Sequence, residues 1–119
     1  MPIILVPAGV ACIVAALIHG YLGQTRLIAP AKFPGGQAKA LVNVIWQFST
    51  AIWAVCGAII AASPWLFDDH ARPVAVLCAC LPLAWGIVGN AWITRGRHFG
   101  WKMFAAIVSV AIVGVYLPS

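Results

Sequence analysis

The sequence is short of charge, and of negative charge above all. Asp, Glu, Lys and Arg make up only 8% of its 119 residues, against about 25% in a typical soluble domain. So few charges cannot cover a surface that faces water, which excludes an ordinary soluble globular fold. The acidic residues are two neighbours, Asp68 and Asp69. No carboxylate therefore falls inside an apolar stretch, and no pair of carboxylates is available there for catalysis.

The sequence also lacks a recognisable metal or cofactor motif. No two of its three histidines stand four residues apart, which is the helical spacing that suits zinc. We expect no metal and no cofactor, and a site shared by His19 and His98 is the weaker alternative. The cluster of Asp68, Asp69 and His70 is interpreted as a solvated loop that sets orientation, with a hard-cation site as its alternative.

The four cysteines do not form a metal-binding motif either. Cys12, Cys56, Cys78 and Cys80 all fall inside apolar stretches, so we interpret them as small buried hydrophobes. Cys78 and Cys80 stand two residues apart, which directs their side chains about 200° apart on a helix and makes them a poor chelate.

What the sequence has instead is four long apolar stretches, in a composition that is 64% hydrophobic. A helix of about 20 residues crosses about 30 Å of hydrocarbon, and four such helices use nearly the whole chain. We predict a single domain, residues 1–119, with an all-α membrane fold, an antiparallel bundle of four transmembrane helices. These cover residues 3–23, 40–62, 73–94 and 103–117, separated by breakers such as Pro34-Gly35-Gly36 and Ser63-Pro64. Pro82 should kink the third helix.

The basic residues orient this bundle. Three lie in or beside the first predicted loop, three lie in or beside the third, and only Arg72 lies in the second. Cytoplasmic loops of membrane proteins are enriched in Lys and Arg. We therefore expect loops one and three in the cytoplasm and both termini outside, in the inner (plasma) membrane of a bacterium. The same explanation removes the case for nucleic-acid binding that a net charge of +5 would otherwise suggest. The six residues are Arg26, Lys32, Lys39, Arg95, Arg97 and Lys102.

Each predicted helix has one face of small and polar residues, which should meet protein or a water-filled cavity rather than lipid. In chain order these faces are Ala8, Cys12, Ala15, Ala16, His19 and Gly23; Asn43, Trp46, Gln47, Thr50, Ala54, Gly57 and Ala61; Ala79, Leu83, Gly86, Asn90 and Thr94; and Lys102, Ala105, Ser109, Val113 and Tyr116.

Polar residues on three of these faces are predicted to lie at the same depth in the bilayer, about a quarter of the way in from the cytoplasmic side. We predict that they form a ligand-binding site, in which the imidazole could accept a proton. A tryptophan stripe beside them suits an aromatic or cationic ligand. The alternative is that these groups only tie helices together through hydrogen bonds. The predicted site consists of His19, Asn43, Trp46, Gln47, Thr50, Trp53 and Asn90.

The third loop forms a compact basic turn, in which Arg95, Arg97 and Lys102 would bind the head group of an anionic lipid. Topology alone also accounts for positive charge there, and that is the alternative interpretation. We expect membrane lipids as partners, together with further copies of the chain or a larger membrane complex, because a single bundle this small encloses little space.

In size and helix count the chain resembles the small multidrug resistance transporters and the small fluoride channels. The transporters use a glutamate embedded in the first helix, which is absent here, and the one-sided charge argues against the dual-topology dimers common in both families. The leading hypothesis is transport or small-ligand binding through the polar site. An accessory or assembly subunit of a larger membrane complex comes second. A membrane enzyme acting on a lipid or quinone comes third, because no catalytic pair is evident.

Overall fold

The computed structural model describes residues 2–117. Over that range it consists of four α-helices, α1 (Leu5–Leu22), α2 (Gly36–Leu66), α3 (Ala71–Ile93) and α4 (Gly100–Tyr116). A π-helical segment, η1 (Gly23–Ile28), extends α1. The described chain is 82% helical and contains no strand, which confirms the all-helical prediction and the number of helices.

The first loop is shorter than predicted, because helix continues on both sides of it. Residues 24–28 contain no helix breaker, so the chain stays helical through η1 and leaves the helix just before Pro30. α2 then begins at Gly36, directly after the Pro34-Gly35 pair. The Lys39 ammonium donates a 3.0 Å hydrogen bond to the carbonyl of Ala29 and thereby closes the loop of residues 29–35.

The end of α2 also differs from the prediction, because the helix passes through Ser63-Pro64 and ends at Leu66. Proline has no N–H, so Pro64 leaves the carbonyl of Ile60 without its usual helical donor. The hydroxyl of Ser63 donates to that carbonyl at 2.7 Å. The serine thus replaces the hydrogen bond that the proline removes, and the helix gains nearly one more turn.

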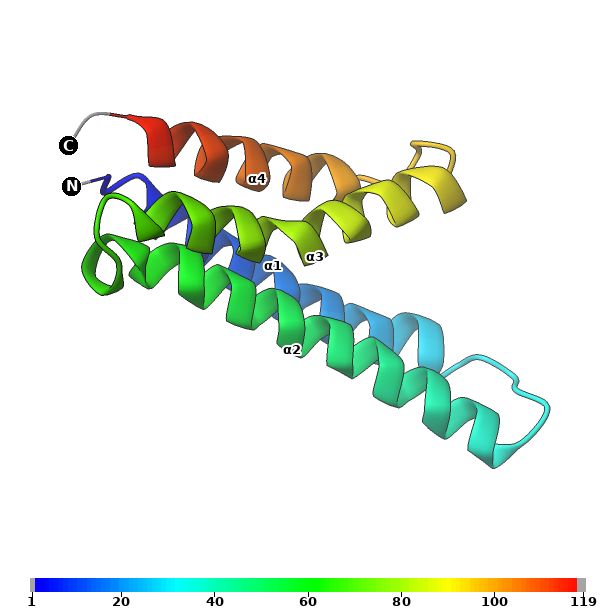
Figure 1. The fold of residues 1–119 in the computed structure, drawn as a ribbon. Helices are drawn as coiled ribbons and strands as arrows, with labels where there is room; N and C mark the ends of the chain where they lie inside the picture. Colours follow the sequence, from blue (N-terminus) through cyan, green and yellow to red (C-terminus); the bar gives the residue numbers. More distant parts are fainter. Residues whose placement is uncertain (1, 118–119) are drawn as a thin grey trace.

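The helices form two antiparallel hairpins, α1 with α2 and α3 with α4 (Figure 1). Glycines permit the close packing of the first hairpin. A Cβ at Gly9 would collide with the backbone of Gly57 and Ala61, and one at Gly57 would lie 2.8 Å from the carbonyl oxygen of Gly9. Small residues of this kind let two helix backbones approach each other.

The hydrophobic core lies toward the end of the molecule that holds the α2–α3 loop and the beginning of α1 (Figure 1). Leu5, Ile60, Val76 and Ala111, one from each helix, are all fully buried there. From this packed end the two hairpins diverge, and Figure 1 shows them well separated where residues 29–35 and 94–99 lie. The figure also shows α3 changing direction midway along its length, where Pro82 lies inside the helix, as predicted for a proline kink.

The buried face predicted for the fourth helix is wrong. The residues expected there are exposed or half-buried, and the buried face lies elsewhere on α4. Gly114 is part of it because a Cβ at this position would lie 2.9 Å from the side chain of Leu5. The predicted face is Lys102, Ala105, Ser109, Val113 and Tyr116, and the buried one is Phe104, Ile107, Ala111 and Gly114.

Three of the helices in the described range are long and apolar enough to cross a membrane: Leu5–Ile28 (α1 with η1), α2 and α3. α4 is apolar but shorter, with 17 residues. Large apolar side chains are exposed all around the bundle, among them Leu17, Phe48 and Leu81. This surface is compatible with a hydrocarbon environment.

Candidate functional site

A cleft of about 370 Å³ lies between α2 and α3, in the half of the molecule where the hairpins diverge. α2 contributes a stripe of residues at spacings of three and four, and α3 contributes a second stripe opposite it. His19 reaches the cleft from α1. The lining residues are His19, Val42, Ile45, Trp46, Ser49, Trp53, Trp85, Gly86, Gly89, Asn90 and Ile93.

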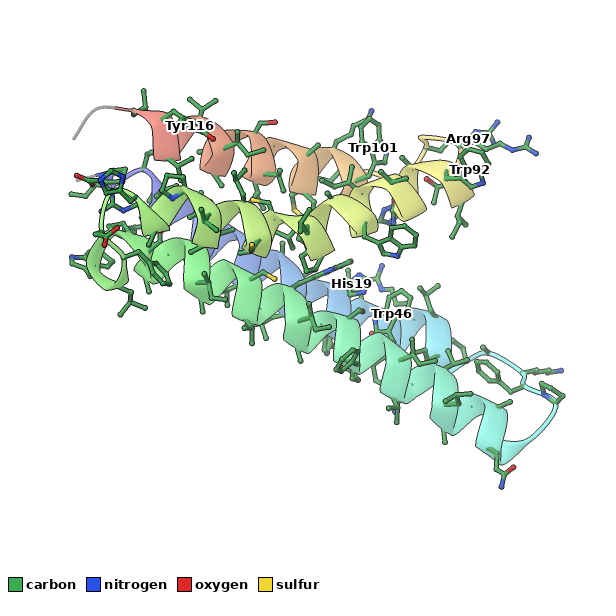
Figure 2. All side chains as sticks on the ribbon, in the orientation of Figure 1. His19, Trp46, Trp92, Arg97, Trp101 and Tyr116 are labelled. Carbon is green, nitrogen blue, oxygen red and sulfur yellow. The ribbon has the colours of Figure 1, made fainter. Side chains whose placement is uncertain are left out.

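The His19 imidazole lies between two tryptophans of α2. Its ring stacks on that of Trp46, with ring centroids 4.3 Å apart and planes 9° from parallel. The ring of Trp53 is tilted by 49° against it at 4.5 Å. The indole N–H of Trp46 donates a 3.1 Å hydrogen bond to the backbone carbonyl of His19, which fixes the stack from a second direction. Figure 2 shows His19 and Trp46 side by side at the point where α3 moves away from α2.

Trp53 forms the inner end of the cleft and contacts all three other helices. It touches His19 of α1, and its ring centroid lies 4.7 Å from that of Phe104 of α4. On α3 it packs against Gly86, where a Cβ would lie 2.5 Å from the indole ring. The absence of a side chain at Gly86 therefore allows this contact between the two hairpins.

Asn90 presents the polar group of the α3 wall. Its side-chain oxygen Oδ1 is buried and accepts no hydrogen bond from residues 2–117. Buried amide oxygens nearly always have a partner, but this oxygen has almost no accessible surface, so a molecule in the cleft does not reach it in this side-chain conformation.

The structure brings four of the predicted site residues together in the cleft, namely His19, Trp46, Trp53 and Asn90, and places the other three outside its lining. Gln47 and Thr50 lie at the contact between α1 and α2. The amide of Gln47 donates to the carbonyl of Gly20 at 3.4 Å, and the buried hydroxyl of Thr50 donates to the carbonyl of Trp46 at 3.2 Å. Asn43 is half-buried, and its Oδ1 also lacks a partner.

Several lining residues were not predicted from the sequence, above all Trp85 and Gly89 on α3. Together with Ile93 they stand at intervals of four residues, so they share one face of the helix. This face lies beside the predicted one of Gly86 and Asn90. A search for a continuous stripe that includes large aromatic residues, rather than small and polar ones alone, would have found it.

The basic turn of residues 94–99 follows α3 and carries its charges outward. Arg95, Arg97 and Lys102 are exposed, and Figure 2 shows Arg97 extending away from the bundle. Arg95 and Gly96 both adopt positive φ angles, 51° and 74°. The indole of Trp101 donates to the carbonyl of Gly96 at 3.0 Å and holds the turn against the start of α4.

Within residues 2–117 no group of three or more His, Cys, Asp or Glu side chains is placed to hold a metal ion. The prediction that all four cysteines are buried is wrong for Cys78, which is exposed, whereas Cys80, two residues on and on another side of the helix, is buried. Cys12 and Cys56 are buried in the core.

Comparison of the chain with family models, with curated proteins and with solved structures gives no match.

Proposed function

We propose that the chain is an integral membrane protein whose four helices cross the bilayer, with residues 29–35 and 94–99 in the cytoplasm and both termini outside. The three long apolar helices support insertion. The distribution of charge supports the orientation, because six of the seven Lys and Arg residues lie in or near these two loops, whereas Asp68, Asp69 and Arg72 lie at the opposite end. Excess positive charge faces the cytoplasm in membrane proteins.

The function that the geometry supports best is the binding of a small molecule in the cleft between α2 and α3, for transport or for sensing. The observation that carries this proposal is the cleft itself, where apolar and aromatic walls surround three polar residues, His19, Ser49 and Asn90. Small-molecule sites have this composition, with a few placed polar groups in a mostly apolar pocket of about 300–1,000 Å³.

A substitution that fills the cleft tests this proposal. Gly89 lines the cleft and has open space beside it, so Gly89→Leu should occupy the cleft without a clash. Val88 is exposed and outside the lining, so Val88→Leu is a matched control on the neighbouring residue. Both variants and the wild type would be purified in lipid nanodiscs, and their solvent-extractable molecules compared by mass spectrometry.

We expect one molecule to copurify with the wild type and with Val88→Leu, and to fall several-fold in Gly89→Leu. Equal amounts of every extracted molecule in all three samples would count against a ligand in the cleft.

An accessory or assembly subunit of a larger membrane complex is the second candidate. Trp85 and Trp92 on α3 are 81% and 84% exposed, and such an aromatic surface would suit a partner helix as well as lipid. Native mass spectrometry after mild extraction separates the two candidates. A different protein in fixed stoichiometry would support this alternative, and a monomer or homo-oligomer that carries no second protein would oppose it.

We also propose that the basic turn binds the head group of an anionic lipid through Arg95, Arg97 and Lys102, which are exposed at its surface. Replacing all three by glutamine should lower the number of phosphatidylglycerol molecules retained in native mass spectra. Unchanged retention would leave these residues with a role in topology alone.

A further inference from the structure

We propose that the ligand of the cleft is a phospholipid with an anionic head group, which places one acyl chain between α2 and α3 and its phosphate at the basic turn of residues 94–99. This inference rests on the proposed binding function and names the class of the ligand. It also joins the cleft and the basic turn into a single site. It follows from the length of the cleft, from the chemistry of its walls and from the charges at its cytoplasmic end.

The cleft follows the two helices over the depth of one leaflet. On α2 its lining runs from Val42 to Trp53, near the middle of that helix, and on α3 it covers the second half, from Trp85 to Ile93. A separation of eleven residues along a helix, as between Val42 and Trp53, corresponds to about 16 Å. Half of a hydrocarbon core of about 30 Å is about 15 Å. In the orientation proposed above, the cleft therefore has the length of an acyl chain in the inner leaflet.

The walls of the cleft suit a hydrocarbon chain. Most of the lining is aliphatic or aromatic, and its polar residues offer an occupant little to bind. The hydroxyl of Ser49 already donates to the carbonyl of Trp46 at 2.7 Å. The side-chain oxygen of Asn90 has almost no accessible surface, and His19 packs its ring against Trp46 and Trp53. An acyl chain needs no hydrogen-bond partner, whereas a ligand rich in polar groups would lose its hydrogen bonds with water on entering.

The charge at the cytoplasmic end of the cleft selects the head group. Ile93, the last lining residue on α3, is followed by Arg95 and Arg97, which are both exposed. The two acidic residues, Asp68 and Asp69, lie in the loop at the opposite end. A phosphate at the basic turn therefore meets guanidinium groups, which bind phosphate through paired hydrogen bonds, and meets no carboxylate. A zwitterionic head group is disfavoured, because it brings a cation of its own to the same turn.

The cleft is open to the bilayer, so a lipid can enter it sideways. Trp85 lines the cleft and is 81% exposed, and a Cβ at Gly89 would meet nothing within 4 Å. Figure 1 shows α2 and α3 diverging toward the ends that hold residues 29–35 and 94–99. One chain slides between the hairpins while the second stays in the bilayer and the head group stays at the surface. Entry therefore requires no transfer of the phosphate through the apolar interior.

Phosphatidylglycerol and phosphatidylcholine with brominated acyl chains test this proposal, because bromine quenches tryptophan fluorescence on contact. Each would be titrated separately into nanodiscs of unlabelled phosphatidylcholine that hold the protein. Trp46 and Trp53 line the cleft and report a chain within it. Either lipid also touches the exposed tryptophans, so the measured quantity is the ratio of the two lipid fractions that give equal quenching.

One pair of variants tests the place of the chain. Gly89→Leu fills the cleft and keeps every charge, and Val88→Leu is its control on an exposed neighbour outside the lining. We expect the wild type and Val88→Leu to prefer phosphatidylglycerol about tenfold, as two nearby guanidinium groups predict, and Gly89→Leu to lose this preference. No preference in the wild type, a preference kept in Gly89→Leu, or the same loss in Val88→Leu would overturn the proposal.

A second pair of variants tests the place of the head group. Arg95→Gln combined with Arg97→Gln removes two charges where the cleft ends. Arg26→Gln combined with Lys32→Gln removes two exposed charges from the region of the first loop, at the same end of the molecule. The first combination should abolish the preference, and the second should leave most of it. Equal losses would mean that the preference comes from the general field of the basic end and not from a head group at the turn, which contradicts the proposal.

Failure of the underlying binding function gives a different result. If Gly89→Leu keeps the lipid preference but loses another extractable molecule, the cleft binds a ligand that is not this lipid. If Gly89→Leu changes neither the lipid preference nor the extracted molecules, the cleft binds nothing. If Gly89→Leu does not fold, Gly89→Val serves in its place, and the wild-type ratio is decisive in either case.

Discussion

Arg72 is a charged residue in a buried position, with only 8% of the residue exposed. Its guanidinium donates to the carbonyls of Ser63 and Phe67, at 3.4 and 2.9 Å, and to the carboxylate of Asp69 at 2.7 Å. The first two acceptors lie at the end of α2, where the carbonyl of Ser63 also accepts the backbone N–H of Phe67 at 3.3 Å. Arg72 at the start of α3 therefore ties one hairpin to the other.

Replacing Arg72 by alanine should destabilise the protein by about 1.5–3 kcal/mol, because it leaves buried carbonyls without their charged donor. Asp69→Asn is the comparison, since that side chain is 77% exposed and exposed ion pairs contribute about 0–1 kcal/mol. Thermal unfolding in detergent would measure both. Equal losses in the two variants would mean that Arg72 acts through Asp69 and not through the helix end.

Asp68 shapes the same turn from the other side. Its carboxylate accepts the backbone N–H groups of Ala71 and His70, at 2.8 and 3.0 Å, and these hydrogen bonds lower the pKa of Asp68 below its ordinary value. The interpretation of the cluster from 68 to 70 as a solvated loop remains a prediction. The two hydrogen bonds to Asp68 give this acidic residue a structural role, because they hold the backbone N–H groups of His70 and Ala71 where α3 begins.

Single residues also show how far the candidate site could be derived from sequence. The small and polar face of α1 was predictable, because its helical spacing alone brings Cys12, Ala16 and His19 to one side. Gln47 was not, because a long amide side chain can turn toward either neighbour of its helix. It bonds to Gly20 of α1 instead of facing the cleft, and only the positions of α1 and α3 relative to α2 decide this.

At the scale of the helices, Gly86 and Gly89 on α3 differ in how much space a side chain would have. A Cβ at Gly86 would lie 2.5 Å from Trp53, whereas one at Gly89 would meet nothing within 4 Å. Gly86→Ala should therefore destabilise the protein by about 1–3 kcal/mol through overpacking. Gly89→Ala should be neutral or stabilising by up to about 1 kcal/mol, because alanine favours helix over glycine.

Unfolding in detergent, together with the emission wavelength of Trp53 in a variant that lacks the other tryptophans near the cleft, would measure this difference. A Gly86→Ala protein as stable as the wild type would show that α2 and α3 can separate there without penalty.

The face of α4 could not be derived from sequence for a physical reason. In water the apolar side of a helix is the buried one, but lipid accepts apolar side chains as readily as protein does. Polarity therefore led to Lys102, Ser109 and Tyr116, which are exposed. Shape selects the buried side instead, as the fit of Gly114 against Leu5 shows, and shape complementarity depends on the partner helices.

At the scale of the whole molecule, the helix lengths are unequal. α2 has 31 residues, which rise about 46 Å, and α4 has 17, which rise about 25 Å. A hydrocarbon core of about 30 Å lies between these lengths. If the protein spans a bilayer as proposed, α2 tilts or extends into water at its Gly36 end, and the bilayer adapts around α4.

The proposed orientation of the molecule can be tested with one cysteine at each end. Ala31 and His70 are exposed and lie in loops at opposite ends of the bundle. In a Cys78→Ala background, a membrane-impermeant maleimide should label His70→Cys in intact spheroplasts, and Ala31→Cys only after permeabilisation. The native cysteines at 12, 56 and 80 are buried and provide the unlabelled baseline. Labelling of both loops in intact cells would reveal dual topology.

The divergence of the two hairpins has a mechanical consequence for a protein embedded in lipid. The helices pack tightly at one end and separate at the other (Figure 1), so the molecule is a wedge, and with the proposed orientation its broad end lies in the inner leaflet. Because the space between the hairpins cannot stay empty in a bilayer, acyl chains must fill whatever part of it a ligand leaves free. The protein would thus add more area to the inner leaflet than to the outer one. It should favour membrane regions in which the inner leaflet has the larger area, that is, regions where the inner leaflet lies on the convex side.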